Sequence, residues 1–233
     1  MSRTQAIIQN RLLKSLTPED FETIGPNLEP FQLELKQMVA HEATPITHVF
    51  FVESGVLSLL AQSPEGRIEV GMIGREGALG VAGAFGAERH PNGVLCQSRG
   101  EALRIAADDL RRAVQQSPSL AARMGLYLHF KTIQIGQTAY ANATLNIEAR
   151  LARWILMTDD RVDGFELTLT HEFLSMMLGT HRPGVTTAVH VLEGAKMIRA
   201  ERGTITVLDR SKLEELASDA YGLAEAEYER LFA

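Results

Sequence analysis

The stretch "GTHRPGVTTAVHVLEG", residues 179–194, decides how the last third of the chain folds. Its apolar residues recur at helical spacing, yet Pro183 and Gly184 stand within it. Proline in a helix interior costs about 3 kcal/mol, and glycine costs about 1 kcal/mol more than alanine. Proline is harmless in the first turn of a helix. We therefore predict two helices, one stopping at Gly179 and one beginning at Pro183-Gly184, joined by the turn Thr180-His181-Arg182.

The flanking residues complete a known unit. Thr170 is the expected N-cap of the first helix, "HEFLSMML". Two short helices joined by a turn that begins with glycine form a helix-turn-helix. The next stretch, "KMIRAERGTITV", alternates around Arg202-Gly203 and predicts a β-hairpin wing. Ser211 and Glu214 predict a capping box for a terminal helix.

A long helix is expected before this unit. From about Ser117, "SPSLAARMGLYLHFKTIQIGQTAYANA" has apolar residues at three- and four-residue spacings and on more than one face. One face then packs on the preceding domain and another on a second copy of the chain. A helix buried within a single chain is the alternative. The residues expected at the dimer interface are Met124, Tyr127, Leu128 and Ile135. A second helix is expected from Asn146 to about Met157.

The first part of the chain predicts short strands after two helices. Thr17-Pro18-Glu19-Asp20 is a helix start, with Thr17 as the N-cap. From about Phe31 the pattern changes to strands, with turns at Glu53-Ser54-Gly55 and "SPEGR" and a glycine-rich stretch before "VLCQ" and "ALRIA". Such strands are typical of a jelly-roll-like β-domain. We predict an α+β chain with a β-roll over 1–116, a dimerisation helix over 117–145 and a winged helix-turn-helix over 146–233.

Composition limits the classes of protein. The chain has 233 residues, of which 45% are hydrophobic and 22% charged, as in an ordinary globular protein. No apolar run is long enough to span a membrane, and the N-terminus lacks the pattern of a signal peptide. Cys96 is the only cysteine, which excludes an internal disulfide. We expect a cytoplasmic protein.

Charge is unevenly distributed. The net charge is −6, but from Arg182 to Arg202 four basic residues stand against Glu193 and Glu201. The acidic excess falls partly in the segment after Lys212. The distribution, rather than the sum, decides whether nucleic acid can bind. The balance permits DNA binding without requiring it.

The order β-roll, long helix, winged helix-turn-helix resembles the Crp/Fnr family of bacterial transcription regulators. The resemblance covers nearly the whole chain and is carried by "VFFVESGVLSLL", "IGREGALG", "NIEARLARWIL" and "LTHEFLSMMLGTHRPGVTTAVHVLEGAKMI". It implies a homodimer that binds double-stranded DNA, with RNA polymerase as a further partner and no enzymatic activity.

The resemblance implies that residues 181–190 face DNA. Arg182 matches an arginine that family members use at the start of this helix, for a phosphate or a guanine edge. Pro183 replaces the glutamate that commonly follows, and Thr187 replaces an arginine, so a different half-site is expected. The full set of expected DNA-binding residues is Thr170, His181, Arg182, Gly184, Thr186, Thr187, His190 and Arg202.

The cyclic-nucleotide cassette of the family is incomplete in this sequence. Leu79-Gly80-Val81 stand where a glutamate holds the ribose in cAMP-responsive relatives. Arg89 matches the phosphate-binding arginine only if the loop has one extra residue, and His90-Pro91 replace the small donor after it. Ile135-Gly136 replace the pair that touches adenine. We expect no response to cAMP; the candidate effector pocket comprises Leu79, Gly80, Arg89, His90 and Ile135.

The same sequence also bears on other cofactors and functions. One cysteine cannot hold an iron–sulfur cluster. Haem stays open because His41, His48, His90 or His129 can serve as an axial ligand, although no spacing selects one. No cofactor and no metal site is predicted. The alternatives are a cupin-like metalloenzyme, which lacks its histidine cluster here, a regulatory module that contacts protein, and a cyclic-nucleotide regulator with an atypical pocket.

Overall fold

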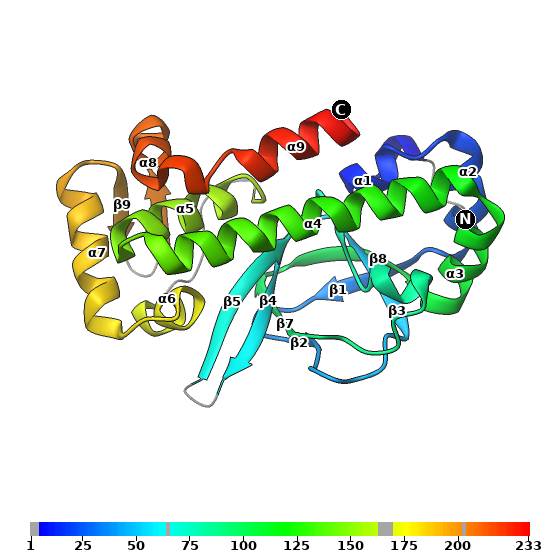
Figure 1. Ribbon diagram of the computed structural model, residues 1–233, viewed down its shortest axis with the longest axis horizontal. Coiled ribbons are helices and arrows are strands. Elements are labelled where there is room, and N and C mark those ends of the chain that lie inside the picture. Colours follow the sequence, from blue (N-terminus) through cyan, green and yellow to red (C-terminus); the bar gives the residue numbers. More distant parts are fainter. Residues whose placement is uncertain (1–4, 64–65, 163–169, 202–203) are drawn as a thin grey trace. The chain divides into compact units, whose positions relative to one another are not determined.

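The computed structural model describes residues 5–63, 66–162, 170–201 and 204–233 (Figure 1). Short helices come first, then two sheets, the long helix and a helical region with a two-stranded wing. The helices are η1 (Gln5–Ile7), α1 (Arg11–Lys14), α2 (Pro18–Ile24), η2 (Gly25–Asn27), η3 (Val81–Phe85), α3 (Ala107–Gln116), α4 (Pro118–Thr144), α5 (Ile147–Asp159), α6 (His171–Leu178), α7 (Arg182–Gly194), α8 (Arg210–Ala217), η4 (Ser218–Ala220) and α9 (Leu223–Phe232).

Two four-stranded sheets form the β-roll. Their strand orders are β1-β8-β3-β6 and β2-β7-β4-β5. In the first sheet β8 pairs antiparallel with both β1 and β3, so that Phe31 lies opposite Ala102 and Phe51 opposite Leu103. The strands are β1 (Glu29–Leu33), β2 (Met38–Ala40), β3 (His48–Val52), β4 (Val56–Ser63), β5 (Gly66–Ile73), β6 (Ala78–Leu79), β7 (Gly93–Ser98) and β8 (Gly100–Ala106).

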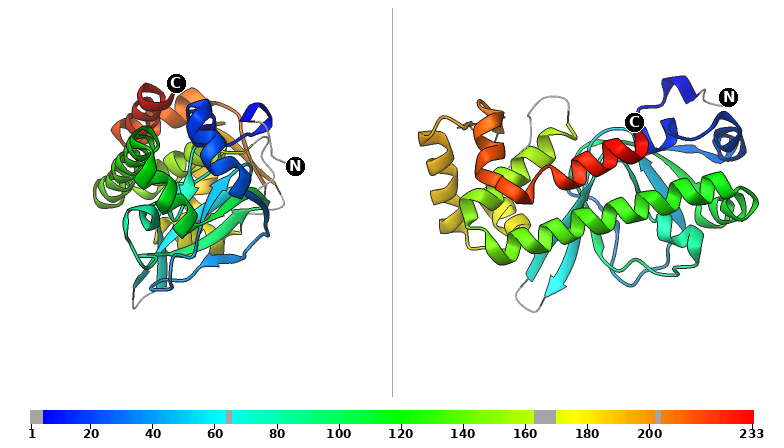
Figure 2. Two further views of the ribbon diagram at one scale, coloured as in Figure 1. Left: turned by 90° about the vertical axis from the view of Figure 1, so that its right-hand side faces the viewer. Right: turned by 45° about the horizontal axis from the view of Figure 1, so that its top comes forward.

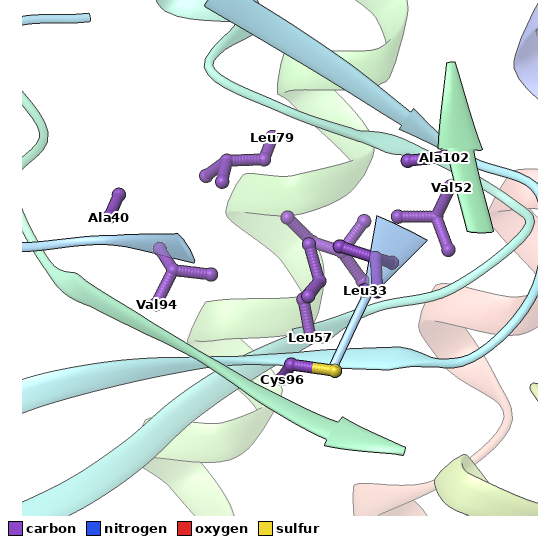
Figure 3. Close-up of a cluster of buried hydrophobic side chains, with 9 residues drawn as sticks. Leu33, Ala40, Val52, Leu57, Leu79, Val94, Cys96 and Ala102 are labelled. Atoms are coloured by element: carbon purple, nitrogen blue, oxygen red, sulfur yellow. The ribbon is translucent and has the colours of Figure 1, made fainter. Parts of the chain in front are cut away.

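The core of the β-roll draws on every one of these strands (Figure 3). Burying each large aliphatic side chain stabilises the fold by about 1.5–3 kcal/mol. Burial and the Glu34 charge raise the pKa of the Cys96 thiol to about 11, so this thiol stays protonated at neutral pH. The cluster comprises Leu33, Ala40, Val52, Leu57, Ile73, Leu79, Val94, Cys96 and Ala102.

Residue contacts group the chain into two units. The first contains Met1–Leu59, Met72–Thr132 and Glu227–Ala233. The second contains Leu60–Gly71 and Ile133–Ala226. The three-part division into 1–116, 117–145 and 146–233 stays a prediction. Residues Leu60–Gly71, from the β4–β5 hairpin, belong to the same unit as the helix-turn-helix. Residues Glu227–Ala233 belong to the same unit as most of the β-roll.

Capping residues explain most helix starts. Thr17 accepts a hydrogen bond from the Asp20 N–H and Asn146 from the Ala149 N–H, as N-caps do. The predicted capping box at Ser211 and Glu214 is wrong, because Asp209 is the N-cap of α8 and bonds the Lys212 N–H. Glu214 instead pairs with Arg210 at 2.8 Å.

Two helices were not predicted as separate elements. Helix α3 begins directly after β8 without a side-chain cap, so no sequence signal marks its start. Helix α9 follows a break at Ser218 and Gly222, both with positive φ. The long helix α4, by contrast, runs from Pro118 to Thr144, close to the predicted range.

Candidate nucleic-acid interface

The first helix of the helix-turn-helix is held by its caps. The Thr170 side chain accepts a hydrogen bond from the Phe173 N–H at 3.1 Å, as expected for an N-cap. At the other end Gly179 adopts a left-handed conformation with φ +55°. The buried side chains Leu174, Met177 and Leu178 face the second unit's own core.

Gly179 is required for a second reason. A Cβ atom there would lie 2.3 Å from Cδ1 of Ile68 in strand β5. Both residues belong to the second unit. A side chain at residue 179 would therefore require the end of the Ile68 side chain to shift, in addition to straining the backbone.

The second helix begins as the Pro183-Gly184 pair requires. Helix α7 starts at Arg182, one residue earlier than predicted, with His181 as an N-cap that makes no side-chain bond. Pro183 lies in the first turn, where its missing N–H has no partner to lose. The N–H groups of Gly184 and Val185 both donate to the His181 carbonyl, at 3.0 and 3.3 Å.

Helix α7 has one buried and one exposed face. Val185, Ala188, Val189 and Leu192 are buried. α5 packs against α7 and also against α8 (Figure 1). The exposed residues of α7 and its N-cap are His181, Arg182, Pro183, Thr187, His190, Val191 and Gly194. Six of the predicted DNA-facing residues lie fully or partly exposed there, namely His181, Arg182, Gly184, Thr186, Thr187 and His190.

Arg182 occupies the position where an anion binds best. Among the described residues, its guanidinium has no hydrogen-bond or ion-pair partner, and it is exposed. The N-terminus of a helix carries the positive end of the helix dipole, although in this first turn Pro183 has no N–H and the Gly184 and Val185 N–H groups donate to the His181 carbonyl. A phosphate or a guanine edge can therefore reach both the arginine and the helix end.

Thr186 is oriented by a neighbour that sequence reasoning missed. The Thr186 hydroxyl donates to the Arg182 carbonyl at 3.1 Å. Nδ1 of His171 lies 2.8 Å from Oγ1 of Thr186. Because the Thr186 hydroxyl hydrogen is donated to the carbonyl, the Nδ1–H group of His171 donates to the Thr186 oxygen. The only signal in the sequence was the position of His171 directly after the Thr170 cap.

Two of the predicted DNA-binding residues stand apart. Gly184 faces inward, because a Cβ there would lie 2.9 Å from Cδ1 of Ile147 on α5. Arg202 lies outside the described residues, between β9 (Ile198–Glu201) and β10 (Thr204–Val207) of the wing. The Ala200 N–H donates to the Glu193 carboxylate at 2.8 Å, which ties β9 to α7.

The predicted effector residues are engaged in packing and backbone contacts. Leu79 is 5% exposed and belongs to the β-roll core (Figure 3). A Cβ at Gly80 would lie 2.7 Å from the His48 carbonyl. Arg89 donates to the Ala43 carbonyl at 2.7 Å. Burial lowers the pKa of His90.

Ile135 belongs to the second unit, whereas Leu79, Gly80, Arg89 and His90 belong to the first. Within the described residues, no group of three or more His, Cys, Asp or Glu side chains is placed to hold a metal ion. His41 and His129, two of the histidines considered for haem, are exposed.

Two of the predicted dimer residues are unavailable to a partner. Met124 and Tyr127 are 0% and 1% exposed, so they pack within their own chain. Leu128 is half-buried, and Ile135 is 37% exposed. The apolar pattern was correctly assigned to a helix with two faces, but Met124 and Tyr127 lie on the inner one.

Comparisons with known proteins match both parts of the chain. The family model of the cyclic nucleotide-binding domain matches residues 30–117, and that of the Crp-like helix-turn-helix domain matches residues 149–216. The cAMP-activated global transcriptional regulator CRP of Escherichia coli is 23% identical over 181 residues, covering 74% of this chain and 86% of CRP.

Solved structures of regulators share the fold. A crp/fnr-family regulator from Eubacterium rectale superposes with a TM-score of 0.68 and 20% identity, covering 88% of this chain and 97% of that one. The c-di-GMP-responsive global regulator CLP of Xanthomonas campestris gives a TM-score of 0.67 at 16% identity, covering 82% and 99%. No helix among the described residues is long and apolar enough to cross a membrane. With a cyclic nucleotide-binding domain followed by a long helix and a Crp-like helix-turn-helix domain, the chain belongs to the Crp/Fnr family of DNA-binding transcription regulators.

Proposed function

We propose that two copies of this chain bind a DNA operator as a homodimer, with helix α7 of each copy in the major groove, and that cAMP does not control this binding. The exposed face of α7, with Arg182 at its positive end, is the observation that carries the proposal. Residues near the N-terminus of such a recognition helix contact base edges, and a helix N-terminus can also contact the phosphate backbone.

Exposed apolar side chains of α4 support the homodimer. Leu126 and Ile135 are each 37% exposed and Tyr140 is 44% exposed. At 100° per residue, Leu126 and Tyr140 lie close together around the helix and Ile135 lies on its opposite flank. A Cβ at Gly125 or Gly136 would meet nothing within 4 Å. The chain's own packing therefore does not need these glycines, whereas a second helix can approach closely where they lie.

The residues at the cassette support independence from cAMP. Leu79 lies in the core where relatives offer a carboxylate, and Arg89 is bonded to a backbone carbonyl. Anion and ribose recognition needs a guanidinium and a carboxylate directed at the ligand. E. coli CRP is described as cAMP-activated, and that property is not carried over to this chain.

The test is selection from a random DNA pool, followed by titration of the selected operator. We expect enrichment of a two-fold symmetric sequence, with half-sites about one helical turn apart. The affinity must fall as salt rises, because phosphate contacts release counterions. No enrichment, or an affinity insensitive to salt, would favour a module that contacts protein instead. RNA polymerase, the further partner that the family suggests, is tested by transcription in vitro from a promoter that carries the selected operator.

A further inference from the structure

The backbone of residues 74–78 is held from several sides. This segment, here called the cassette entry, leads from β5 into β6 and η3. The Arg11 N–H donates to the Arg75 carbonyl at 2.7 Å, and the Asn10 side-chain amide donates to the Gly77 carbonyl at 2.8 Å. The N-terminal residues therefore hold two of its backbone carbonyls, those of Arg75 and Gly77.

Helix α4 holds the next residue. The Tyr127 hydroxyl donates to the Ala78 carbonyl and accepts from the Ala78 N–H, both at 2.9 Å. A Cβ at Gly77 would lie 2.3 Å from the same hydroxyl oxygen. Glycine at this position is what lets the tyrosine reach the backbone.

The remaining carbonyl of the cassette entry is held by the end of the chain. The Tyr228 hydroxyl on α9 donates to the Glu76 carbonyl at 2.7 Å. Tyr228 is 3% exposed, and its ring lies edge-on to Phe130 of α4 at 4.9 Å and stacked on Phe232 at 4.6 Å. The Arg11 guanidinium lies 4.8 Å above the same ring.

Further contacts fix the last turns of α9 along α4 (Figure 2). Arg123 donates to the Leu231 carbonyl at 2.8 Å, and its guanidinium lies 5.5 Å from the Phe232 ring. Arg11 pairs with Glu229 at 2.6 Å. Residues 227–233 are thereby an integral part of the first unit.

The first turn of α9 is anchored in the other unit. Ala224 is 3% exposed, and the Glu225 carboxylate accepts a hydrogen bond from the Gly222 N–H at 3.0 Å. Burial in α5 lowers the pKa of Arg153, and the negative charge of Glu225 opposes this shift. Arg153 donates a hydrogen bond to the Ala220 carbonyl at 2.7 Å. One helix of ten residues therefore has its two ends fixed in different units.

We propose that α9 is a strap that couples the cassette entry to the DNA-binding region, with the Tyr228–Glu76 hydrogen bond as its contact to the cassette entry. The proposal rests on the proposed function, because the coupling is read out at the operator. A ligand or modification that displaces residues 74–78 breaks this bond and frees the end of α9. The signal then travels along α9 and does not need to pass through α4.

Tyr228→Phe tests the strap, because it removes the hydroxyl and keeps the ring contacts. Tyr127→Phe loosens the same backbone from α4 and leaves α9 untouched. Tyr140→Phe, at an exposed tyrosine of α4, is the control. Amide hydrogen exchange of the full-length proteins is followed at residues 74–78 and 227–232, and the operator Kd is measured in parallel.

We expect Tyr228→Phe and Tyr127→Phe each to raise exchange at both segments about two- to tenfold, as the loss of one buried hydrogen bond allows. Both should shift the operator Kd about fivefold in the same direction, and Tyr140→Phe should change exchange at neither segment. The strap proposal is overturned if Tyr127→Phe raises amide exchange at residues 74–78 but leaves exchange at residues 227–232 at the wild-type rate. Coupled exchange with an unchanged operator Kd would overturn its link to DNA. If the wild type binds no operator, the proposed function fails, and the exchange data alone decide whether the two segments are coupled.

Discussion

Arg182 is the residue on which DNA binding should depend most directly. It is exposed at the N-terminus of α7, at the positive end of the helix dipole, which favours an anion. Arg182→Ala should weaken operator binding by about 1–3 kcal/mol with relaxed specificity at one base pair if it reads a guanine. If Arg182 contacts phosphate, binding should weaken evenly across sequences. The slope of log affinity against log salt concentration should then fall in magnitude by about one.

The control for this variant is Arg89→Ala, which removes an exposed arginine of the first unit. Both variants should keep their helical content, since neither arginine is buried. Equal operator affinities for Arg182→Ala and the wild type, in folded protein, would show that α7 does not enter the groove in this way.

Gly179 is the residue on which the turn depends. Gly179→Ala places a side chain at φ +55°, which costs about 1–2 kcal/mol. Overlap with Ile68 should add about 1–3 kcal/mol to the loss in the free energy of unfolding. Urea denaturation of Gly179→Ala, Ile68→Ala and the double variant separates the two causes. The double variant should lose less than the sum of the single losses, and strict additivity would rule out the contact.

His90 should make stability depend on pH. Burial lowers its pKa in the folded state, so the unfolded chain binds a proton at a higher pH than the folded chain does. Its contribution is therefore complete above the ordinary pKa of 6.5 and is lost as pH falls through the lowered value. Urea unfolding between about pH 8 and pH 5 should show this loss.

His90→Gln should flatten this part of the pH dependence, whatever its effect on absolute stability. His41→Gln, at an exposed histidine, is the matched control and should leave the slope unchanged. A slope that is the same in His90→Gln as in the wild type would assign the pH dependence to other groups.

At the scale of elements, α4 carries the prediction of dimerisation. Ile135→Glu puts a charge on an exposed flank of this helix, where Ile135 is 37% exposed. Sedimentation at micromolar concentration should give about twice the chain mass of 25.6 kDa for the wild type and a lower average mass for the variant. Leu35→Glu, at a similarly exposed leucine of 41%, should remain a dimer. A monomeric wild type would contradict the proposed assembly.

Elements were predictable where a local signal marks their ends. Thr17, Asn146 and Thr170 were read as caps or helix starts, and each caps its helix in the structure. Helix α3 has no side-chain cap, and its first residue directly follows a strand. At α8 two oxygen-bearing side chains, Asp209 and Ser211, stand close together, and the sequence could not decide which one meets the free N–H groups.

The two faces of α4 show a second limit of the sequence. Periodicity places Met124 and Ile135, eleven residues apart, on the same side of the helix, and Tyr140 on another. It does not say which side meets the chain's own sheets. Tyr127 is buried because its hydroxyl finds the Ala78 backbone beside Gly77, a contact between residues distant in sequence. Long-range contacts of this kind, rather than propensity, decide which of the predicted residues are buried within the chain and which are exposed.

At the scale of the molecule, the chain does not divide into consecutive segments. It passes between the two units after Leu59, Gly71, Thr132 and Ala226. The hairpin end at residues 60–71 has the strand pattern of its sheet, yet Ile68 meets the turn glycine of the helix-turn-helix. The last residues likewise return to the β-roll through Tyr228. Neither return leaves a signal in local sequence, because each depends on contacts between residues distant in the chain.

Independence from cyclic nucleotides is the prediction that concerns the protein as a whole. A ligand shifts a conformational equilibrium only by its difference in affinity for the two states. Where the cassette of a cAMP-responsive regulator offers a carboxylate and a free arginine, this chain has a core leucine, Leu79, and an arginine bonded to Ala43. Calorimetry with cAMP and with cGMP should therefore show no binding, and neither nucleotide at millimolar concentration should change the operator Kd. E. coli CRP, described as cAMP-activated, is the positive control under the same conditions. Micromolar affinity for either nucleotide would contradict the prediction, and loss of that affinity in Arg89→Ala would then identify Arg89 as the phosphate ligand.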